Sequence, residues 1–162
     1  MLNSKNSSPI IDIREIYRIE PDGSRTYMAF GDGIYKQGFP FEDYISTARK
    51  LSSAERLPNN FPVFDYFTVN KEAISVKTLD TGASTYQNPN RIRYKLNQYI
   101  DKVDNYNEGG SSSFNLESAN ISSKTIELAV PSTTNIAQWD AINKSILYAN
   151  SKNIKFNITV VK

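Results

Sequence analysis

The sequence of 162 residues contains no cysteine and no histidine. The lack of cysteine excludes disulfides and thiolate zinc sites. The lack of histidine excludes Ser-His-Asp and Cys-His nucleophilic mechanisms, histidine-dependent ribonuclease chemistry and histidine-bound zinc. An enzyme of this composition must therefore work with carboxylate, lysine, arginine, tyrosine or serine side chains. A divalent metal held by oxygen ligands is the obvious complement to such groups.

Long apolar runs are also lacking. No run approaches the roughly 18 residues needed to cross a bilayer, so we expect no stable membrane insertion. The length suits one compact domain, and we predict a polar linker or tail at 1–8 followed by a single domain over 9–162. The 19 basic and 17 acidic residues give a net charge of +2, which is compatible with a nucleic-acid partner without indicating one.

The first half of the chain has clear turn and helix signals. Residues 10–19 and 26–30 flank the turn sequence PDGS and form either a hairpin or a short helix followed by a strand. A helix is predicted over 40–51, because it begins with proline and carries apolar residues at helical spacing. These apolar residues are Phe41, Tyr44, Ile45, Ala48 and Leu51.

The remainder alternates between strand-like and helix-like segments. Two runs rich in aromatic and β-branched residues, 62–68 and 73–79, are separated by a short polar stretch and predict a hairpin. A helix is predicted next at 91–105, followed by a flexible polar segment with strand-like fragments at 107–123. The chain then continues with a strand at 124–130, a helix at 134–151 that places Trp139 in the core, and a strand at 154–161. This order indicates an α/β fold, whose last strand–helix–strand unit suits a parallel crossover.

Three polar residues in the predicted hairpin are candidates for chemistry. Asp65 lies within the apolar run FPVFDYF and Lys77 within AISVKTL. Because side chains alternate along a strand, Ser75 and Lys77 share one face. A charged residue in so apolar a strand must be paired or serve a ligand, so a cross-strand ion pair between Asp65 and Lys77 explains the pattern as readily as an active site.

The surrounding blocks resemble a known family. A helix carboxylate, then an aspartate on a strand, then a short polar-x-Lys pair on the adjacent strand resembles the PD-(D/E)xK nuclease superfamily. More closely, QGFPFEDYIS, RLPNNFPVFDYF, AISVKTLDT and YQNPNRIRYKLNQYIDKV, with the ending ELAVPSTTNIAQWDAINKSILYANSKNIKFNITVVK, resemble the C-terminal nuclease toxin domains of contact-dependent growth inhibition effectors of the CdiA type. The resemblance covers about 37–162, and it implies a restriction-endonuclease-like core with a central mixed sheet flanked by helices.

The resemblance also implies an active site. It assigns the helix glutamate to Glu42, the strand aspartate to Asp65 and the terminal pair to Ser75 and Lys77. In that assignment Glu42 and Asp65 hold a divalent metal (Zn²⁺, or Mg²⁺ or Mn²⁺), which activates water for attack on a phosphodiester. Lys77 then stabilises the transition state, and Ser75 holds the water or the metal shell by its hydroxyl. Ser75 stands where many superfamily members have a carboxylate, so the site has fewer formal negative charges.

The substrate and the competing carboxylates stay open at this stage. Glu55 and Asp43 are alternatives to Glu42, which also suits an ordinary helix N-terminus. The cations Arg91, Arg93 and Lys95 on the helix at 91–105 form either a solvated face or a contact to phosphates.

Three hypotheses for function follow from these readings. The first is a metal-dependent DNA endonuclease toxin. The second keeps the same fold and site but acts on tRNA. The third, from another class, is a non-catalytic binding or immunity module.

The resemblance further implies a partner and a route. A toxin of this group is part of a larger effector at the surface of the producing bacterium and is delivered into the cytoplasm of a target cell. Its producer needs a cognate immunity protein. We place the docking surface for that protein on 107–123, where a protruding hairpin offers a strand edge for β-augmentation.

Overall fold

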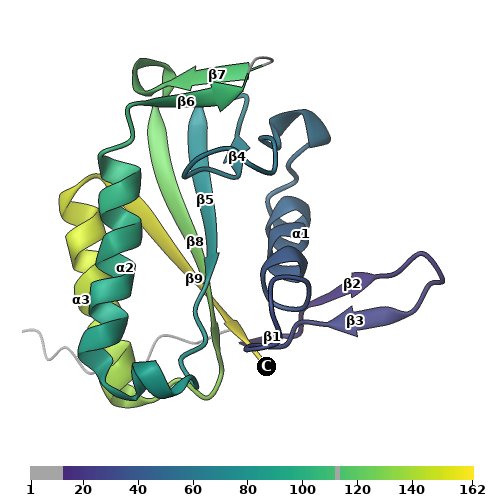
Figure 1. The fold of residues 1–162 in the computed structure, drawn as a ribbon, viewed down its shortest axis with the longest axis vertical. Coiled ribbons are helices and arrows are strands. Elements are labelled where there is room, and N and C mark those ends of the chain that lie inside the picture. Colours follow the sequence, from purple (N-terminus) through teal and green to yellow (C-terminus); the bar gives the residue numbers. More distant parts are fainter. Residues whose placement is uncertain (1–12, 112–113) are drawn as a thin grey trace, which may run out of the picture.

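A mixed sheet with helices on both faces forms the centre of the computed structural model, which describes residues 13–111 and 114–162 (Figure 1). The sheet consists of β1 (Ile13–Arg14), β4 (Tyr66–Phe67), β5 (Glu72–Thr78), β8 (Ser123–Pro131) and β9 (Ile154–Val161). The helices are α1 (Gly38–Ala48), α2 (Pro89–Asp104) and α3 (Ile136–Ser151). Two separate hairpins pair β2 (Tyr17–Ile19) with β3 (Arg25–Tyr27), and β6 (Glu108–Ser111) with β7 (Phe114–Glu117). The α/β prediction is confirmed; the linker predicted at 1–8 lies outside the described residues.

The strand order in the sheet is β1-β9-β8-β5-β4. The strands β1, β9, β8 and β5 run parallel to one another, and β4 pairs antiparallel with β5. The predicted parallel crossover is therefore present as β8–α3–β9. Strand β8 is buried from Thr125 to Val130, as expected for a central strand covered on both faces.

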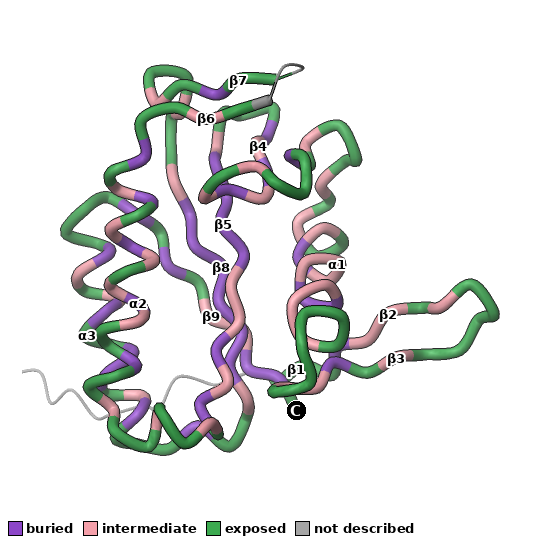
Figure 2. The backbone as a smooth tube through the Cα atoms, in the orientation of Figure 1, coloured by how far each residue is buried: buried purple, intermediate pink, exposed green. Residues whose placement is uncertain are grey.

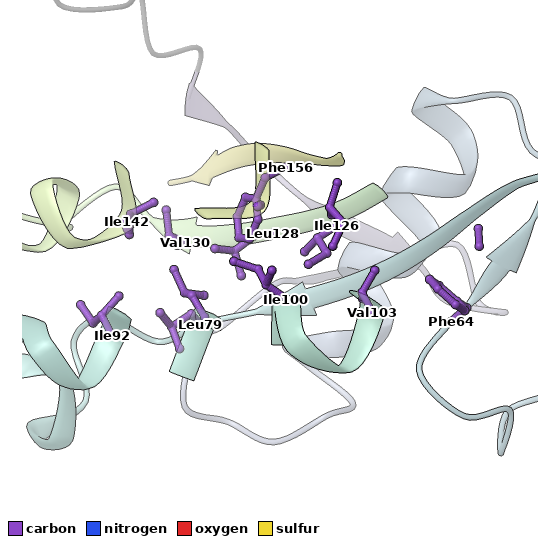
Figure 3. Close-up of a cluster of buried hydrophobic side chains, with 14 of the residues drawn as sticks. Phe64, Leu79, Ile92, Ile100, Val103, Ile126, Leu128, Val130, Ile142 and Phe156 are labelled. Carbon is purple, nitrogen blue, oxygen red and sulfur yellow. The ribbon is translucent and has the colours of Figure 1, made fainter. Parts of the chain in front are cut away.

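Each face of the sheet has its own apolar core. Helices α2 and α3 cover one face, where Ile92 and Ile100 of α2 pack with Ile126 and Leu128 of β8 (Figure 3). The helix predicted at 91–105 is α2, which begins two residues earlier because Pro89 suits the first turn and the Asn88 side chain accepts a hydrogen bond from the Asn90 N–H.

Helix α1 covers the opposite face of the sheet (Figures 1 and 2). Its buried Phe41 and Ile45 pack with Ile74 and Val76 of β5. The same cluster includes Ile16 and Met28, which border the β2–β3 hairpin. The sheet therefore carries α1 and β2–β3 on the side opposite to α2 and α3.

The strand predicted at 62–68 was wrong in extent, since only Tyr66–Phe67 pair as β4. Pro62 lacks an N–H, and Val63 adopts a left-handed backbone conformation with φ of 69°, which no regular strand contains. The chain consequently runs along β5 only from Asp65 onward. This short β4 leaves the later part of β5 without a neighbouring strand on that side.

Other predictions differ in detail. The first two runs form a β2–β3 hairpin around PDGS, so the alternative of a helix and a strand was wrong. Helix α1 ends at Ala48, which is exposed rather than buried, and Trp139 is only partly buried. The polar segment 107–123 contains the paired strands β6 and β7.

Among the described residues, no helix combines the length and the apolarity required to span a bilayer.

Candidate active site

The open edge of β5 is where the predicted site residues meet. The backbone N–H of Asp65 donates to the Ile74 carbonyl over 2.8 Å, in the manner of a strand. Two residues further along β5, the Val76 N–H donates to the Asp65 carboxylate oxygen Oδ2 over 2.7 Å. The Asp65 side chain thus replaces the missing backbone acceptor of β4. Because the N–H and C=O of one strand residue face the same side, the Val76 carbonyl also faces this open edge.

A cavity of about 690 Å³ lies at this edge, between α1 and α2. Glu42 from α1, Asp65 before β4 and Lys77 from β5 all line it. Three of the four predicted catalytic residues therefore meet at one cavity. Its other polar or aromatic lining residues are Gln37, Phe39, Arg56, Asn59, Asn60, Thr78 and Tyr99.

Glu42 is partly buried and paired. Its Oε2 atom accepts a hydrogen bond from a terminal nitrogen of Arg56 over 2.6 Å. Burial raises the pKa of the Glu42 carboxyl, the neighbouring Asp65 charge raises it further, and Arg56 opposes both effects. The Glu42 carboxylate therefore experiences both the negative charge of Asp65 and the positive charge of Arg56.

The pKa of Asp65 is also shifted by opposing effects. Burial raises its pKa, while the Val76 N–H and then the charges of Lys77 and Arg56 lower it less strongly. Glu42 and Asp65 thus offer two partly buried carboxylates to one cavity, whose lining also contains the cations Arg56 and Lys77.

Lys77 lies on the α2 side of the sheet edge. Its Nζ atom is 5.4 Å from the centroid of the Tyr99 ring, and the Nζ of Lys95 is 5.3 Å from the same centroid. Tyr99 of α2 is partly buried against the apolar core and also lines the cavity. Lys95, predicted to contact substrate, is thereby placed beside the cavity. Arg91 and Arg93 are exposed on α2 and are absent from the cavity lining.

Ser75 is fully buried beneath the site and does not line the cavity. Its Oγ atom has no hydrogen-bond partner among the described residues. An unsatisfied buried hydroxyl is rare in folded proteins and is most often found where a polar ligand or water completes the site. Ser75 and Lys77 lie on one face of β5, as the alternation predicted.

Arg56 is a site residue that sequence reasoning missed. Besides Glu42, it approaches Asp43, with a terminal nitrogen 3.9 Å from Oδ1. Its guanidinium carbon is 6.0 Å from the Tyr66 ring centroid. Arg56 follows a turn in a segment without regular periodicity, so no local signal distinguishes it from other exposed arginines.

The competing carboxylates lie elsewhere. Glu55 accepts hydrogen bonds from the N–H groups of Ser52 and Val69, so it stabilises a turn rather than the cavity. Asp43 pairs with Arg18 over 3.2 Å and is absent from the lining of this cavity. Glu42 is therefore the α1 carboxylate at the site.

The donor set for a metal is small. Among the described residues, no group of three or more acidic, histidine or cysteine side chains is arranged to hold an ion. Glu42 and Asp65 supply two carboxylates, and the Val76 carbonyl faces the same edge. Hard oxygen donors of this kind fit a divalent cation. The buried Ser75 hydroxyl of the same strand is a further polar group without a partner among the described residues.

Comparisons with known proteins agree with this architecture. The family model described as "CDI toxin restriction endonuclease-like domain" matches residues 37–159. The chain is 38% identical over 143 residues to "Deoxyribonuclease CdiA-o11" of Escherichia coli O157:H7 (strain EC869), an alignment that covers 87% of this chain and 37% of that protein. It is 36% identical over 137 residues to "Deoxyribonuclease CdiA" of Yersinia pseudotuberculosis serotype O:3 (strain YPIII), covering 83% of this chain and 12% of the relative. The chain thus spans only a minor part of the length of these relatives.

A solved structure is similar over its whole length. The chain in "CdiA-CT/CdiI toxin and immunity complex from Yersinia pseudotuberculosis" is 35% identical to this chain, with a TM-score of 0.69. The match covers 76% of this chain and 99% of the solved one. The family model, the relatives and the mixed sheet with its open edge agree. The chain therefore belongs to the family of CDI toxin restriction endonuclease-like domains.

Proposed function

We propose that this domain is a metal-dependent DNA endonuclease that acts as a toxin in contact-dependent growth inhibition. One observation carries the proposal: Glu42, Asp65 and Lys77 reach a single cavity at the open edge of the sheet. Two acids are suited to holding a metal ion, and a lysine is suited to stabilising the charge that develops in phosphodiester hydrolysis. The names of the two relatives, both deoxyribonucleases, favour DNA as the substrate.

The roles follow from the position of each group. Glu42 and Asp65 would hold a divalent ion together with the Val76 carbonyl, with Ser75 beneath them. Such an ion supplies Lewis acidity and lowers the pKa of water, and restriction-endonuclease-like nucleases generally use one. Zn²⁺, Mg²⁺ and Mn²⁺ all accept the available oxygen donors.

Lys77 has a role separate from metal binding. Its ammonium lies at the sheet edge beside the two carboxylates, where it stabilises the negative charge that develops on the phosphate oxygens as water attacks phosphorus. It also holds the attacking water by hydrogen bonding. Lys95, beside Tyr99, contacts a phosphate of the bound strand, and Arg91 and Arg93 extend the basic surface along α2.

The test is incubation of the purified protein with supercoiled plasmid and with tRNA, in buffers containing Zn²⁺, Mg²⁺ or Mn²⁺ or a chelator. We expect plasmid nicking that depends on the metal and disappears in Asp65→Ala. Intact plasmid with every metal, or equal nicking by Asp65→Ala, would refute the proposal. Cleavage of tRNA with intact plasmid would transfer the same site to the alternative substrate.

An immunity protein is the expected partner, because the similar solved structure is titled as a toxin and immunity complex. We place its contact on the β6–β7 hairpin, whose outer edges offer backbone groups for β-augmentation (Figure 1). Gly110 allows close packing there, since a Cβ at this position would lie 2.2 Å from the Phe114 carbonyl oxygen. Gly110→Val should therefore disrupt the hairpin and weaken immunity binding, while Ala119→Val in the following turn should not. Equal binding by both variants would mean that the inhibitor covers another surface, such as the active site.

The route of delivery follows from the relatives. The matched regions belong to much longer CdiA proteins, so we propose that this domain is presented on the surface of the producing bacterium as part of a larger effector. It would then act in the cytoplasm of the target cell. Expression of the domain in cells with and without a candidate immunity protein, with DNA integrity as the readout, tests this placement.

A further inference from the structure

A second cavity, of about 370 Å³, adjoins the candidate active site. The two cavities share Phe39, Arg56 and Asn59 as lining residues, so Arg56 stands in the wall between them. The second cavity is completed by Arg18 of β2, Tyr35 of the loop before α1, and Asp43 of α1. Arg18 and Tyr35 precede the region matched by the family model, which begins at residue 37.

The second cavity has an excess of positive charge. Arg18 Nε lies 3.2 Å from Asp43 Oδ2, and a terminal nitrogen of Arg56 lies 3.9 Å from Asp43 Oδ1. Arg18 is therefore paired with Asp43, while Arg56, whose nearest carboxylate is Glu42 at 2.6 Å, also approaches Asp43 from the wall between the two cavities. Each guanidinium carries five N–H donors in a planar fork, more than these two carboxylates occupy in the contacts described. Such a pair of arginines is suited to a phosphate group.

The second cavity also presents aromatic surface. Tyr35 is 69% exposed although its ring packs edge-on against Phe39, with centroids 5.5 Å apart. The guanidinium carbon of Arg18 lies 5.8 Å from the Tyr35 ring centroid. An exposed aromatic ring beside a cation is the arrangement by which proteins stack a nucleobase next to a bound phosphate.

We propose that this second cavity binds the nucleotide adjacent to the scissile phosphate of DNA. Arg18 and Arg56 would hold the neighbouring phosphate, and Tyr35 would stack on the attached base. When DNA is absent, Asp43 pairs with Arg18 and Glu42 pairs with Arg56. The inference rests on the proposed function, and it adds a substrate-positioning role for the β2–β3 hairpin and the loop that follows it.

The deciding measurement is DNA affinity. A short fluorescein-labelled DNA duplex is titrated by anisotropy with the Asp65→Asn protein, which is designed to bind without cleaving, over a series of KCl concentrations. Adding Arg18→Gln should weaken binding by about tenfold and should reduce the slope of log K against log salt by about one, the effect of one lost phosphate contact. Arg25→Gln on the same hairpin, an exposed arginine outside both cavities, is the matched control and should change neither quantity.

Asp43→Asn separates substrate binding from a structural role. Arg18→Gln and Asp43→Asn break the same ion pair, so a purely structural contact would make both variants change affinity in the same direction. If the cavity binds phosphate, Asp43→Asn removes a competing negative charge and tightens binding severalfold, while Arg18→Gln weakens it. Tyr35→Leu should also weaken binding without changing the salt slope. If thermal melting shows that Arg18→Gln fails to fold, the affinity of Tyr35→Leu tests whether the second cavity binds DNA.

The outcomes are distinguishable from those of the proposed function. Wild-type protein that leaves plasmid intact refutes the nuclease proposal, whatever the affinity results. Plasmid nicking by the wild type, combined with equal affinities for Arg18→Gln and Arg25→Gln, refutes the second cavity as a DNA site. Weaker binding by Asp43→Asn would refute it as well, as would unchanged affinity in Tyr35→Leu.

Discussion

Replacement of Asp65 by asparagine should abolish activity without loss of stability. Asparagine keeps a side-chain oxygen that can accept the 2.7 Å hydrogen bond from the Val76 N–H, so the sheet edge stays satisfied. It removes the negative charge needed to hold a cation. We expect plasmid nicking to fall by at least about a hundredfold, a loss that even an outer partner of a metal ligand can cause.

Comparison with Asp65→Ala gives the contribution of the hydrogen bond between Asp65 and the Val76 N–H to the stability of the fold. Alanine leaves the Val76 N–H without its acceptor, and an unsatisfied buried donor costs about 1–3 kcal/mol. Because the donor lies at the edge of a cavity that admits water, the lower end of that range applies. Asp65→Ala should therefore be about 1 kcal/mol less stable than Asp65→Asn, or about 2–4 °C lower in Tm for a domain of this size.

The stability difference between Asp65→Asn and the wild type should depend on pH. Burial raises the pKa of Asp65 above its ordinary value of 3.8, even after the opposing effects of the Val76 N–H, Lys77 and Arg56. The folded protein thus holds this proton more tightly than the unfolded chain does, and ionisation of Asp65 destabilises the fold. The destabilisation is absent below pH 3.8 and develops as the pH rises through the raised pKa, whereas asparagine never carries it.

Thermal unfolding of the wild type, Asp65→Asn and Asp65→Ala, measured without added metal at acidic and neutral pH, is the assay. At neutral pH, Asp65→Asn should melt at or above the wild-type temperature, and this advantage should shrink at acidic pH. An Asp65→Asn protein that melts well below the wild type at neutral pH would refute the reasoning. So would equal melting temperatures for the asparagine and alanine variants.

Three further predictions concern the cations around the cavity. Lys77→Met should lower nicking by about 10²–10³-fold while the circular dichroism spectrum is retained, and the exposed Lys102→Met serves as control. Arg56→Gln removes a charge that lowers the pKa of Glu42, so the acidic limb of the pH–rate profile should move to higher pH; an unchanged limb would contradict a role for ionised Glu42. Lys95→Gln should weaken DNA binding in anisotropy titrations more than Arg91→Gln does, because only Lys95 lies beside the cavity-lining Tyr99.

The sequence by itself determined the order of the elements and part of the site. Helix α2 and strands β5, β8 and β9 follow from periodicity, because burial of one face imposes a repeat of 3.6 or 2 residues on the local sequence. Asp65 and Lys77 were recognisable as charged residues in apolar runs.

The tertiary structure decided how those residues meet. The Asp65 carboxylate accepts a hydrogen bond from the Val76 N–H in place of a backbone acceptor, and Ser75 is buried outside the cavity lining. Tyr99 lines the cavity as well as packing against the core. None of these positions follows from spacing, since each depends on where β4 stops pairing and on how α2 crosses the sheet.

Neither the contacts of Arg56 nor the second cavity could be predicted from the sequence. The contact from Arg56 to Glu42 joins the segment after α1 to a residue 14 positions earlier within α1, and the pair of Arg18 with Asp43 joins β2 to α1. Local sequence encodes which face of an element is apolar, because that preference is repeated at every turn. A site assembled from single residues of separate elements has no such repeat, so its membership is fixed only when packing brings those elements together.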